Sequence, residues 1–204
     1  MGEGVAGRLT VICGPMFAGK SSELLRRIRR ALHARRPVLL FKPWVDTRSH
    51  GISSHDGLLM EAHIVRSASE IAYLAGQAPN TLVAIDEGQF FDDGIAGVVV
   101  DLVERGHEVA VAGLDLDYHG QPFGPMPVLL ALADEVVKLS AICVRCGADA
   151  TRTQRLVDGQ PAGPGERVLI GGAESYEPRC LRCWVSPAVA AGRPAGAASR
   201  PTRA

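Results

Sequence analysis

Residues 13–22 read CGPMFAGKSS, and this stretch decides the fold. It follows the apolar, β-branched run LTVIC at 9–13 and opens a segment whose apolar residues recur at helical spacing. Gly14-x-x-x-x-Gly19-Lys20-Ser21 matches the full pattern of a phosphate-binding loop between a strand and a helix. Glycines let backbone N–H groups face phosphate oxygens, and the helix N-terminus adds partial positive charge. The stretch therefore predicts a nucleoside triphosphate site.

Side chains in and beyond this loop suit phosphate and Mg²⁺ chemistry. Lys20 supplies a mobile positive charge for the β- and γ-phosphates, and Ser21 supplies a hydroxyl ligand for Mg²⁺. The run TLVAIDEGQFF at 81–91 ends a buried strand in Asp86, the position at which a Walker B carboxylate completes the magnesium shell. Glu87 could act as a general base on water or on a substrate hydroxyl. The Asp-Glu pair alone therefore does not separate a hydrolase from a kinase.

Apolar strands alternate with helices along most of the chain. The expected strands are 9–13, 37–41, 62–66, 81–86, 108–114 and 135–142, and the expected helices are 20–35, a short one between 66 and 81, and 94–105. The stretch 45–58 shows no clear periodicity. This alternation predicts an α/β fold of the P-loop NTPase type, with a mostly parallel sheet flanked by helices. We expect this domain over 1–141, a small metal-binding domain over 142–185, and a disordered tail rich in Ala, Gly, Pro and Arg over 186–204.

Four of the five cysteines form two Cys-x-x-Cys pairs, Cys143 with Cys146 and Cys180 with Cys183. In a reducing compartment such pairs favour a metal over disulfides. Four thiolates make a closed tetrahedral shell, so we expect a structural Zn²⁺, although the 33 residues between the pairs exceed the usual gap and redox chemistry is the alternative. Iron could occupy the same shell. The fifth cysteine, Cys13, is expected to be a buried structural thiol.

Composition narrows the class of protein. The chain has 204 residues, 47% hydrophobic and 22% charged, and a formal net charge of zero. The absence of a basic surplus argues against nucleic acid as a partner, and the apolar runs are too short for a membrane span. We see no signal peptide and expect a cytoplasmic protein. Six arginines crowd residues 26–36, and we expect a solvated or subunit-contact face there rather than a nucleic-acid face.

Further motifs follow one another in a recognisable order. They are GPMFAGKSSELLRRIRR at 14–30, DTR at 46–48, SHD at 54–56, DEGQFF at 86–91, an LD…Y…QPFG segment within 114–124, VVKL at 136–139, the two cysteine pairs, and IGGAESY at 170–176. Together they resemble the thymidine kinases of the cellular, zinc-containing (type II) family over about residues 8–184. The resemblance implies transfer of the γ-phosphoryl group of ATP to the 5′-hydroxyl of thymidine, with deoxyuridine also accepted. It also implies a lasso loop anchored by zinc, a homotetramer, and feedback inhibition by dTTP.

The resemblance also assigns residues. Glu87 matches the general base, and Asp86 and Ser21 match the magnesium-associated positions. The positions that match the ATP site are Gly14, Pro15, Met16, Phe17, Ala18, Gly19, Lys20, Ser21, Ser22, Asp86 and Gln89. The positions that match the thymine pocket and the lasso loop are Met16, Phe90, Leu114, Tyr118, Phe123, Thr153, Leu169, Ile170, Gly171 and Tyr176. Tyr118 stands where some members have Phe, and Asp46 and Arg48 match a loop near the site.

Two other classes of function remain open on the residues alone. A P-loop ATPase whose zinc domain binds nucleic acid or a protein predicts hydrolysis stimulated by polynucleotide. A nucleotide sensor without turnover is the other, and the intact set of Lys20, Ser21, Asp86 and Glu87 argues against it.

Overall fold

The computed structural model describes residues 7–46, 51–53, 59–78, 80–165 and 175–192. The chain forms two compact units. The first contains Met1–Cys13, Lys20–Asp115 and Phe123–Lys138, and the second contains Gly14–Gly19, Leu116–Pro122 and Leu139–Ala204.

A six-stranded sheet forms the centre of the first unit, and every adjacent pair of its strands is parallel. In spatial order the strands are β5 (His63–Val65), β2 (Val38–Pro43), β6 (Leu82–Ile85), β7 (Glu108–Gly113), β1 (Arg8–Cys13) and β8 (Glu135–Lys138). The strand that precedes the phosphate loop, β1, is therefore separated from β6 by β7. This arrangement confirms the predicted α/β fold of the P-loop type.

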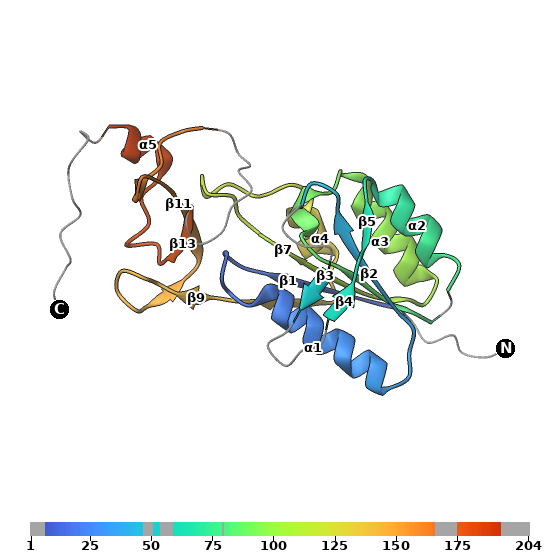
Figure 1. Ribbon diagram of the computed structural model, residues 1–204. Coiled ribbons are helices and arrows are strands. Elements are labelled where there is room, and N and C mark those ends of the chain that lie inside the picture. Colours follow the sequence, from blue (N-terminus) through green and yellow to red (C-terminus); the bar gives the residue numbers. More distant parts are fainter. Residues whose placement is uncertain (1–6, 47–50, 54–58, 79, 166–174, 193–204) are drawn as a thin grey trace. The chain divides into compact units, whose positions relative to one another are not determined.

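Helices cover both faces of this sheet (Figure 1). The helices are α1 (Lys20–His33) on one face, and α2 (Ala68–Ala75), α3 (Gly94–Glu104) and α4 (Met126–Leu132) on the other, with a 3-10 turn η1 (Gly88–Phe90) after β6. In α1 the buried residues Leu24, Leu25, Ile28 and Ala31 follow helical spacing. Glu23 in its first turn and Arg30 and His33 in its last turn complement the helix dipole.

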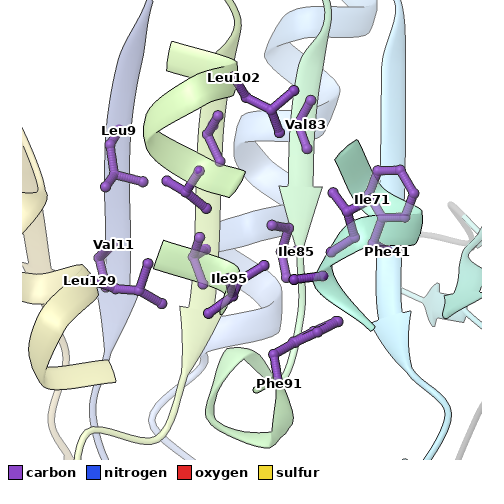
Figure 2. Close-up of a cluster of buried hydrophobic side chains, with 14 of the residues drawn as sticks. Leu9, Val11, Phe41, Ile71, Val83, Ile85, Phe91, Ile95, Leu102 and Leu129 are labelled. Carbon is purple, nitrogen blue, oxygen red and sulfur yellow. The ribbon is translucent and has the colours of Figure 1, made fainter. Parts of the chain in front are cut away.

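The main hydrophobic core lies between the sheet and the helices α2, α3 and α4. Figure 2 shows Leu9 and Val11 of β1 and Val83 and Ile85 of β6 pointing toward the helical residues of this cluster. Ile71, Ile95, Leu102 and Leu129 from these helices are fully buried against them. Each such side chain contributes roughly 1.5–3 kcal/mol through burial. The polar residues of interest follow the carboxyl ends of these buried strands.

The second unit is built from short strands. They are β9 (Ala141–Ile142), β10 (Asp149–Ala150), β11 (Arg152–Val157), β12 (Gln160–Pro161) and β13 (Tyr176–Arg179), followed by helix α5 (Pro187–Ala191). β9 pairs with β10, and β11 pairs with both β12 and β13, all antiparallel. Strands β11 and β13 lie in the long gap between the cysteine pairs and supply ten of its 33 residues.

The structure departs from the sequence-based expectation at four segments. The expected strand 135–142 is two strands, because β1 ends its pairing with β8 at Cys13↔Lys138 and Gly14, with φ +140°, turns the chain away. The stretch 45–58 contains β3 (Gly51–Ser53), which pairs with β4 (Leu59–Glu61) and is too short to show alternation. Helix α4 was not predicted. Ser186 caps α5 inside the expected disordered tail, and residues 193–204 lie outside the described residues.

Several arginines of the basic segment are paired with acids. Arg26 and Arg27 both bond Glu23, at 2.6 Å and 3.1 Å. Arg27 also bonds Glu135 at 2.9 Å, and Arg36 pairs with Glu108. Three of the six arginines, Arg26, Arg27 and Arg36, are thus paired with acids of the same unit. Within the described residues, the helices are too short or too polar to cross a membrane.

Candidate nucleotide and zinc sites

The phosphate loop, residues 14–19, has an unusual backbone. Gly14, Phe17 and Gly19 have φ values of +140°, +66° and +84°. A Cβ at Gly14 would lie 2.3 Å from the carbonyl oxygen of Leu139, so only glycine fits there, whereas at Gly19 the requirement is conformational alone. The N–H of Met16 donates to Thr153 Oγ1 at 3.0 Å. A backbone with left-handed residues can turn neighbouring N–H groups toward a bound anion, so this loop fits the phosphate site that the sequence predicts.

Two oxygen-bearing side chains of the first unit meet after β6. Ser21 in the first turn of α1 donates its hydroxyl to Asp86, with Oγ 3.3 Å and 3.4 Å from the two carboxylate oxygens. Asp86 is buried, and its own N–H donates to the carbonyl of Phe41 at 2.9 Å. A hydroxyl and a carboxylate side by side are the hard oxygen donors that Mg²⁺ prefers, so these residues fit the expected ion.

Burial changes the acidity of this carboxyl group. Desolvation, together with the nearby charge of Glu87, raises the pKa of Asp86 to about 7, while the charges of Lys42 and Lys20 oppose the rise. A bound divalent cation favours the ionised form and reverses this shift. The carboxylate is thus held in a place where its charge needs a cation.

Glu87, the expected general base, directly precedes the turn η1 and has a left-handed backbone, with φ 55° and ψ 42°. For a residue other than glycine this conformation costs about 1 kcal/mol or more, and such strain is often found at functional positions. Its carboxylate oxygen Oε2 accepts from Gln89 Nε2 at 2.6 Å, and Gln89 Oε1 accepts the N–H of Leu114 at 2.9 Å. The side chain of Gln89 thus connects Glu87 with the residue that follows β7.

The residues expected to bind the acceptor occur in both units. In the first unit, the rings of Phe90 and Phe123 pack edge to face, with centroids 5.6 Å apart, and Leu114 is half-buried. In the second unit, Thr153, Tyr118 and Tyr176 are buried, and Tyr176 begins strand β13 rather than lying in a loop. Leu169, Ile170 and Gly171, like Arg48, lie outside the described residues.

Tyr118 has a cationic neighbour that the sequence did not reveal. The guanidinium carbon of Arg155 lies 5.2 Å from the centre of the Tyr118 ring, and Arg155 Nη1 lies 3.5 Å from the hydroxyl oxygen. The hydroxyl that distinguishes Tyr118 from Phe therefore faces a guanidinium. Arg155 comes from β11, 37 residues further along the chain, so no local pattern links the two.

The four paired cysteines converge in the second unit. The sulfur atoms of Cys143, Cys146, Cys180 and Cys183 all lie within 4.8 Å of one another, and those of Cys146 and Cys180 are 3.6 Å apart. A tetrahedral zinc with Zn–S bonds of 2.3 Å places its sulfurs about 3.8 Å apart, so the cluster fits the expected ion. Burial raises the pKa of the Cys143 thiol, but the N–H groups of Cys180, Arg145 and Cys146 outweigh it and bring the pKa to about 6. The fifth thiol, Cys13, is fully buried, and desolvation raises its pKa to about 11, as expected of a structural residue.

The first unit also contains a buried ion pair that was not predicted from the sequence. Lys42 Nζ lies 2.8 Å from Asp46 Oδ2, and both side chains are almost completely inaccessible. The only local signal was a lysine inside the apolar strand PVLLFKP at 37–43. This pair places one residue of the DTR motif at the carboxyl end of β2.

A family model described as thymidine kinase matches residues 7–184. The chain belongs to the thymidine kinase family. The match covers the phosphate loop, Asp86, Glu87 and all four paired cysteines, and it ends just before α5. Phosphorylation of thymidine is the activity that this family supports.

Solved structures give a more distant similarity. The genome packaging NTPase B204 from Sulfolobus turreted icosahedral virus 2, in complexes with ATP-gammaS and with sulfate, matches this thymidine kinase family member at 11% identity and a TM-score of 0.46. Each match covers 67% of this chain and 76% of the viral one. These values are too low to bear on function.

Proposed function

We propose that the protein transfers the γ-phosphoryl group of ATP to the 5′-hydroxyl of thymidine, giving dTMP, and that it also accepts deoxyuridine. The observation that carries the proposal is the group of oxygens after β6 in a chain of the thymidine kinase family. There the Ser21 hydroxyl bonds a buried Asp86, and Glu87 is the next residue. Phosphoryl transfer needs this combination of metal ligands and a base.

The donor half of the reaction uses the loop from Gly14 to Ser22. Its backbone N–H groups bind the phosphates, and Lys20 places its ammonium against the β- and γ-phosphates. Ser21 and Asp86 hold Mg²⁺, which neutralises charge on the phosphate oxygens when it is bound. Because phosphoryl transfer involves little covalent chemistry by the protein, this positioning and charge stabilisation supply most of the catalysis.

In the acceptor half, Glu87 takes the proton of the 5′-hydroxyl as that oxygen attacks the γ-phosphorus and the bond to the leaving oxygen breaks. The aromatic and apolar residues assigned to the acceptor, among them Phe90, Leu114, Tyr118 and Phe123, suit a flat pyrimidine. Backbone groups near Leu169 and Gly171 read the O2, N3 and O4 edge of the base. A site of this kind rejects a base with the wrong edge because its own buried polar groups are then left unpaired.

The remaining features of the proposal concern assembly and regulation. Cys143, Cys146, Cys180 and Cys183 hold a structural Zn²⁺ that anchors the ends of the lasso loop. The protein acts in the cytoplasm in nucleotide salvage, as a homotetramer inhibited by dTTP. These properties rest on family membership and on the cysteine cluster.

The test is to incubate the purified protein with ATP and Mg²⁺ and each deoxynucleoside separately, and to follow monophosphate formation. We expect dTMP from thymidine and dUMP from deoxyuridine. Hydrolysis of ATP without any nucleoside monophosphate would contradict the proposal and favour a P-loop ATPase, which added polynucleotide would then stimulate.

A single substitution tests the assigned base. We expect Glu87→Gln to lower kcat by about 10²–10⁴-fold, the usual contribution of a general base, while binding of ATP is retained. Binding is measured separately by titration calorimetry. Turnover close to that of the wild type would remove Glu87 from the mechanism.

A further inference from the structure

The side chain of Gln89 is an unusual feature of the first unit. It is 2% exposed, although it is a polar residue directly beside the assigned base. Its Nε2 donates to Glu87 Oε2 at 2.6 Å, and its Oε1 accepts the N–H of Leu114 at 2.9 Å. A carboxylate only accepts and an N–H only donates, so one orientation of the amide satisfies both partners.

The packing around Gln89 holds this arrangement in place. A Cβ at Gly113 would lie 2.8 Å from Gln89 Oε1, and a Cβ at Gly124 would lie 2.3 Å from the Gln89 carbonyl oxygen. Gly113 thus lies close to the oxygen of the amide, and Gly124 lies close to the Gln89 backbone. A larger residue at either glycine would collide with Gln89, so both neighbours must be small for this arrangement to fit. Burial and the two hydrogen bonds then hold the amide between its partners.

Glu87 needs such a partner. Its backbone is fixed by a left-handed turn, but three side-chain torsions still separate the carboxylate from that backbone. We propose that Gln89 is a positioning residue that holds the Glu87 carboxylate at a fixed place relative to Leu114 at the end of β7. This inference rests on the proposed function, and it gives Gln89 a role other than the nucleotide contact expected from the resemblance.

The expected effect follows from the sensitivity of catalysis to geometry. A displacement of about 1 Å at a reacting group costs as much as 10²-fold in rate. We expect Gln89→Met, which is similar in length but lacks both hydrogen bonds, to lower kcat by about 10–10²-fold. The KM for ATP stays within about twofold, because the phosphate loop is untouched. Gln89→Glu keeps an oxygen for the Leu114 N–H but removes the donor to Glu87, so it lowers kcat at least as much.

The deciding experiment combines Gln89→Met with Glu87→Gln. If Gln89 acts through Glu87, its substitution lowers the residual kcat of Glu87→Gln by less than about twofold. The matched control is Gln154→Met in the second unit. Gln154 is fully buried and also bridges two groups, accepting from the Val185 N–H at 2.8 Å and donating to the Val185 carbonyl at 3.1 Å. Any effect of this control on kcat is expected to be the same with and without Glu87.

Three results would overturn the proposal. One is wild-type kcat in Gln89→Met or Gln89→Glu, and another is an equal loss from Gln89→Met in both backgrounds. The third is spectroscopic and needs no turnover. The side-chain NH₂ signals of Gln89, assigned by their loss in Gln89→Met, should shift in the ¹H–¹⁵N spectrum of Glu87→Gln, and unmoved signals would show that the contact is absent. A wild-type protein that phosphorylates no nucleoside defeats the proposed function, whereas the spectrum still decides the position of Gln89.

Discussion

The buried pair Lys42–Asp46 supports a quantitative prediction about stability. The charged atoms are 2.8 Å apart, and the side chains are 4% and 2% exposed. At an effective dielectric constant of about 20 the attraction between two unit charges at this distance is about 6 kcal/mol. Desolvation of each ion costs several kcal/mol, so the intact pair makes a net contribution to the free energy of unfolding that is close to zero. When one partner is removed, the attraction is lost, but the remaining ion is still desolvated. The free energy of unfolding therefore falls.

We therefore expect Lys42→Met and Asp46→Asn each to lower the free energy of unfolding by about 3 kcal/mol. The double variant should lose much less than the sum, with a coupling free energy of at least about 2 kcal/mol. The matched control is the pair Arg105–Asp101. It has the same sequence spacing and the same shortest distance of 2.8 Å, but its side chains are 59% and 45% exposed. Its coupling should be below about 0.5 kcal/mol.

The assay is urea unfolding at equilibrium, followed by fluorescence. The chain has two tryptophans, Trp44 in the first unit and Trp184 in the second, so a Trp184→Phe background reports on the first unit alone. All variants are compared in that background, and the comparison requires that the dependence of the unfolding free energy on urea concentration is the same for each. Additive losses from Lys42→Met and Asp46→Asn, or single losses below about 1 kcal/mol, would refute the reasoning.

Three further predictions concern the loop, the base and the metal. Gly14→Ala places a methyl group 2.3 Å from the Leu139 carbonyl oxygen, so we expect loss of nucleotide binding by calorimetry, and unchanged affinity would contradict it. At Glu87, with φ 55°, the Gly variant should be more stable to urea than the Ala variant by about 1 kcal/mol, the reverse of the order expected at Ser69 on the exposed surface of α2. The purified protein should carry one zinc per chain by mass spectrometry. A strong chelator should change the fluorescence of Trp184, which follows Cys183 directly, while a protein with intact fluorescence and no zinc would contradict a structural role.

Local patterns in the sequence predicted the glycine loop between β1 and α1 and the acid that follows β6, because their residue types and spacing are set within a few positions. Gly14, Lys20 and Ser21 lie within one stretch of eight residues, and Asp86 ends an apolar run. The role of Gln89 could not be predicted in the same way. Its second partner, Leu114, is 25 residues away, and the hydrogen bond exists only because β6 and β7 are neighbours in the sheet.

The prediction of one strand boundary was wrong for a related reason. The run 135–142 is apolar enough to suggest one strand, but pairing stops at Lys138 because β1 offers no partner beyond Cys13. The end of a strand is thus fixed by its neighbour rather than by its own sequence. The ion pair of Lys42 could not be predicted either, because a lysine in a short apolar run does not indicate which side chain neutralises it.

Charged side chains gather where the parallel strands of the first unit end. Lys42 lies one residue before the end of β2, and Asp86 follows β6. Lys138, the last residue of β8, lies 3.0 Å from Asp115 after β7. Parallel strands place these ends along one edge, and charge buried there costs free energy unless it is compensated. Of the buried groups, Lys42 has the Asp46 carboxylate and Asp115 has the Lys138 ammonium at hydrogen-bond distance. The Asp86 carboxylate instead accepts from a neutral hydroxyl, and its pKa stays raised to about 7. The burial that makes this carboxyl hard to ionise also makes a cation beside it favourable, and this is the physical reason for proposing Asp86, rather than another acid of this edge, as the Mg²⁺ ligand.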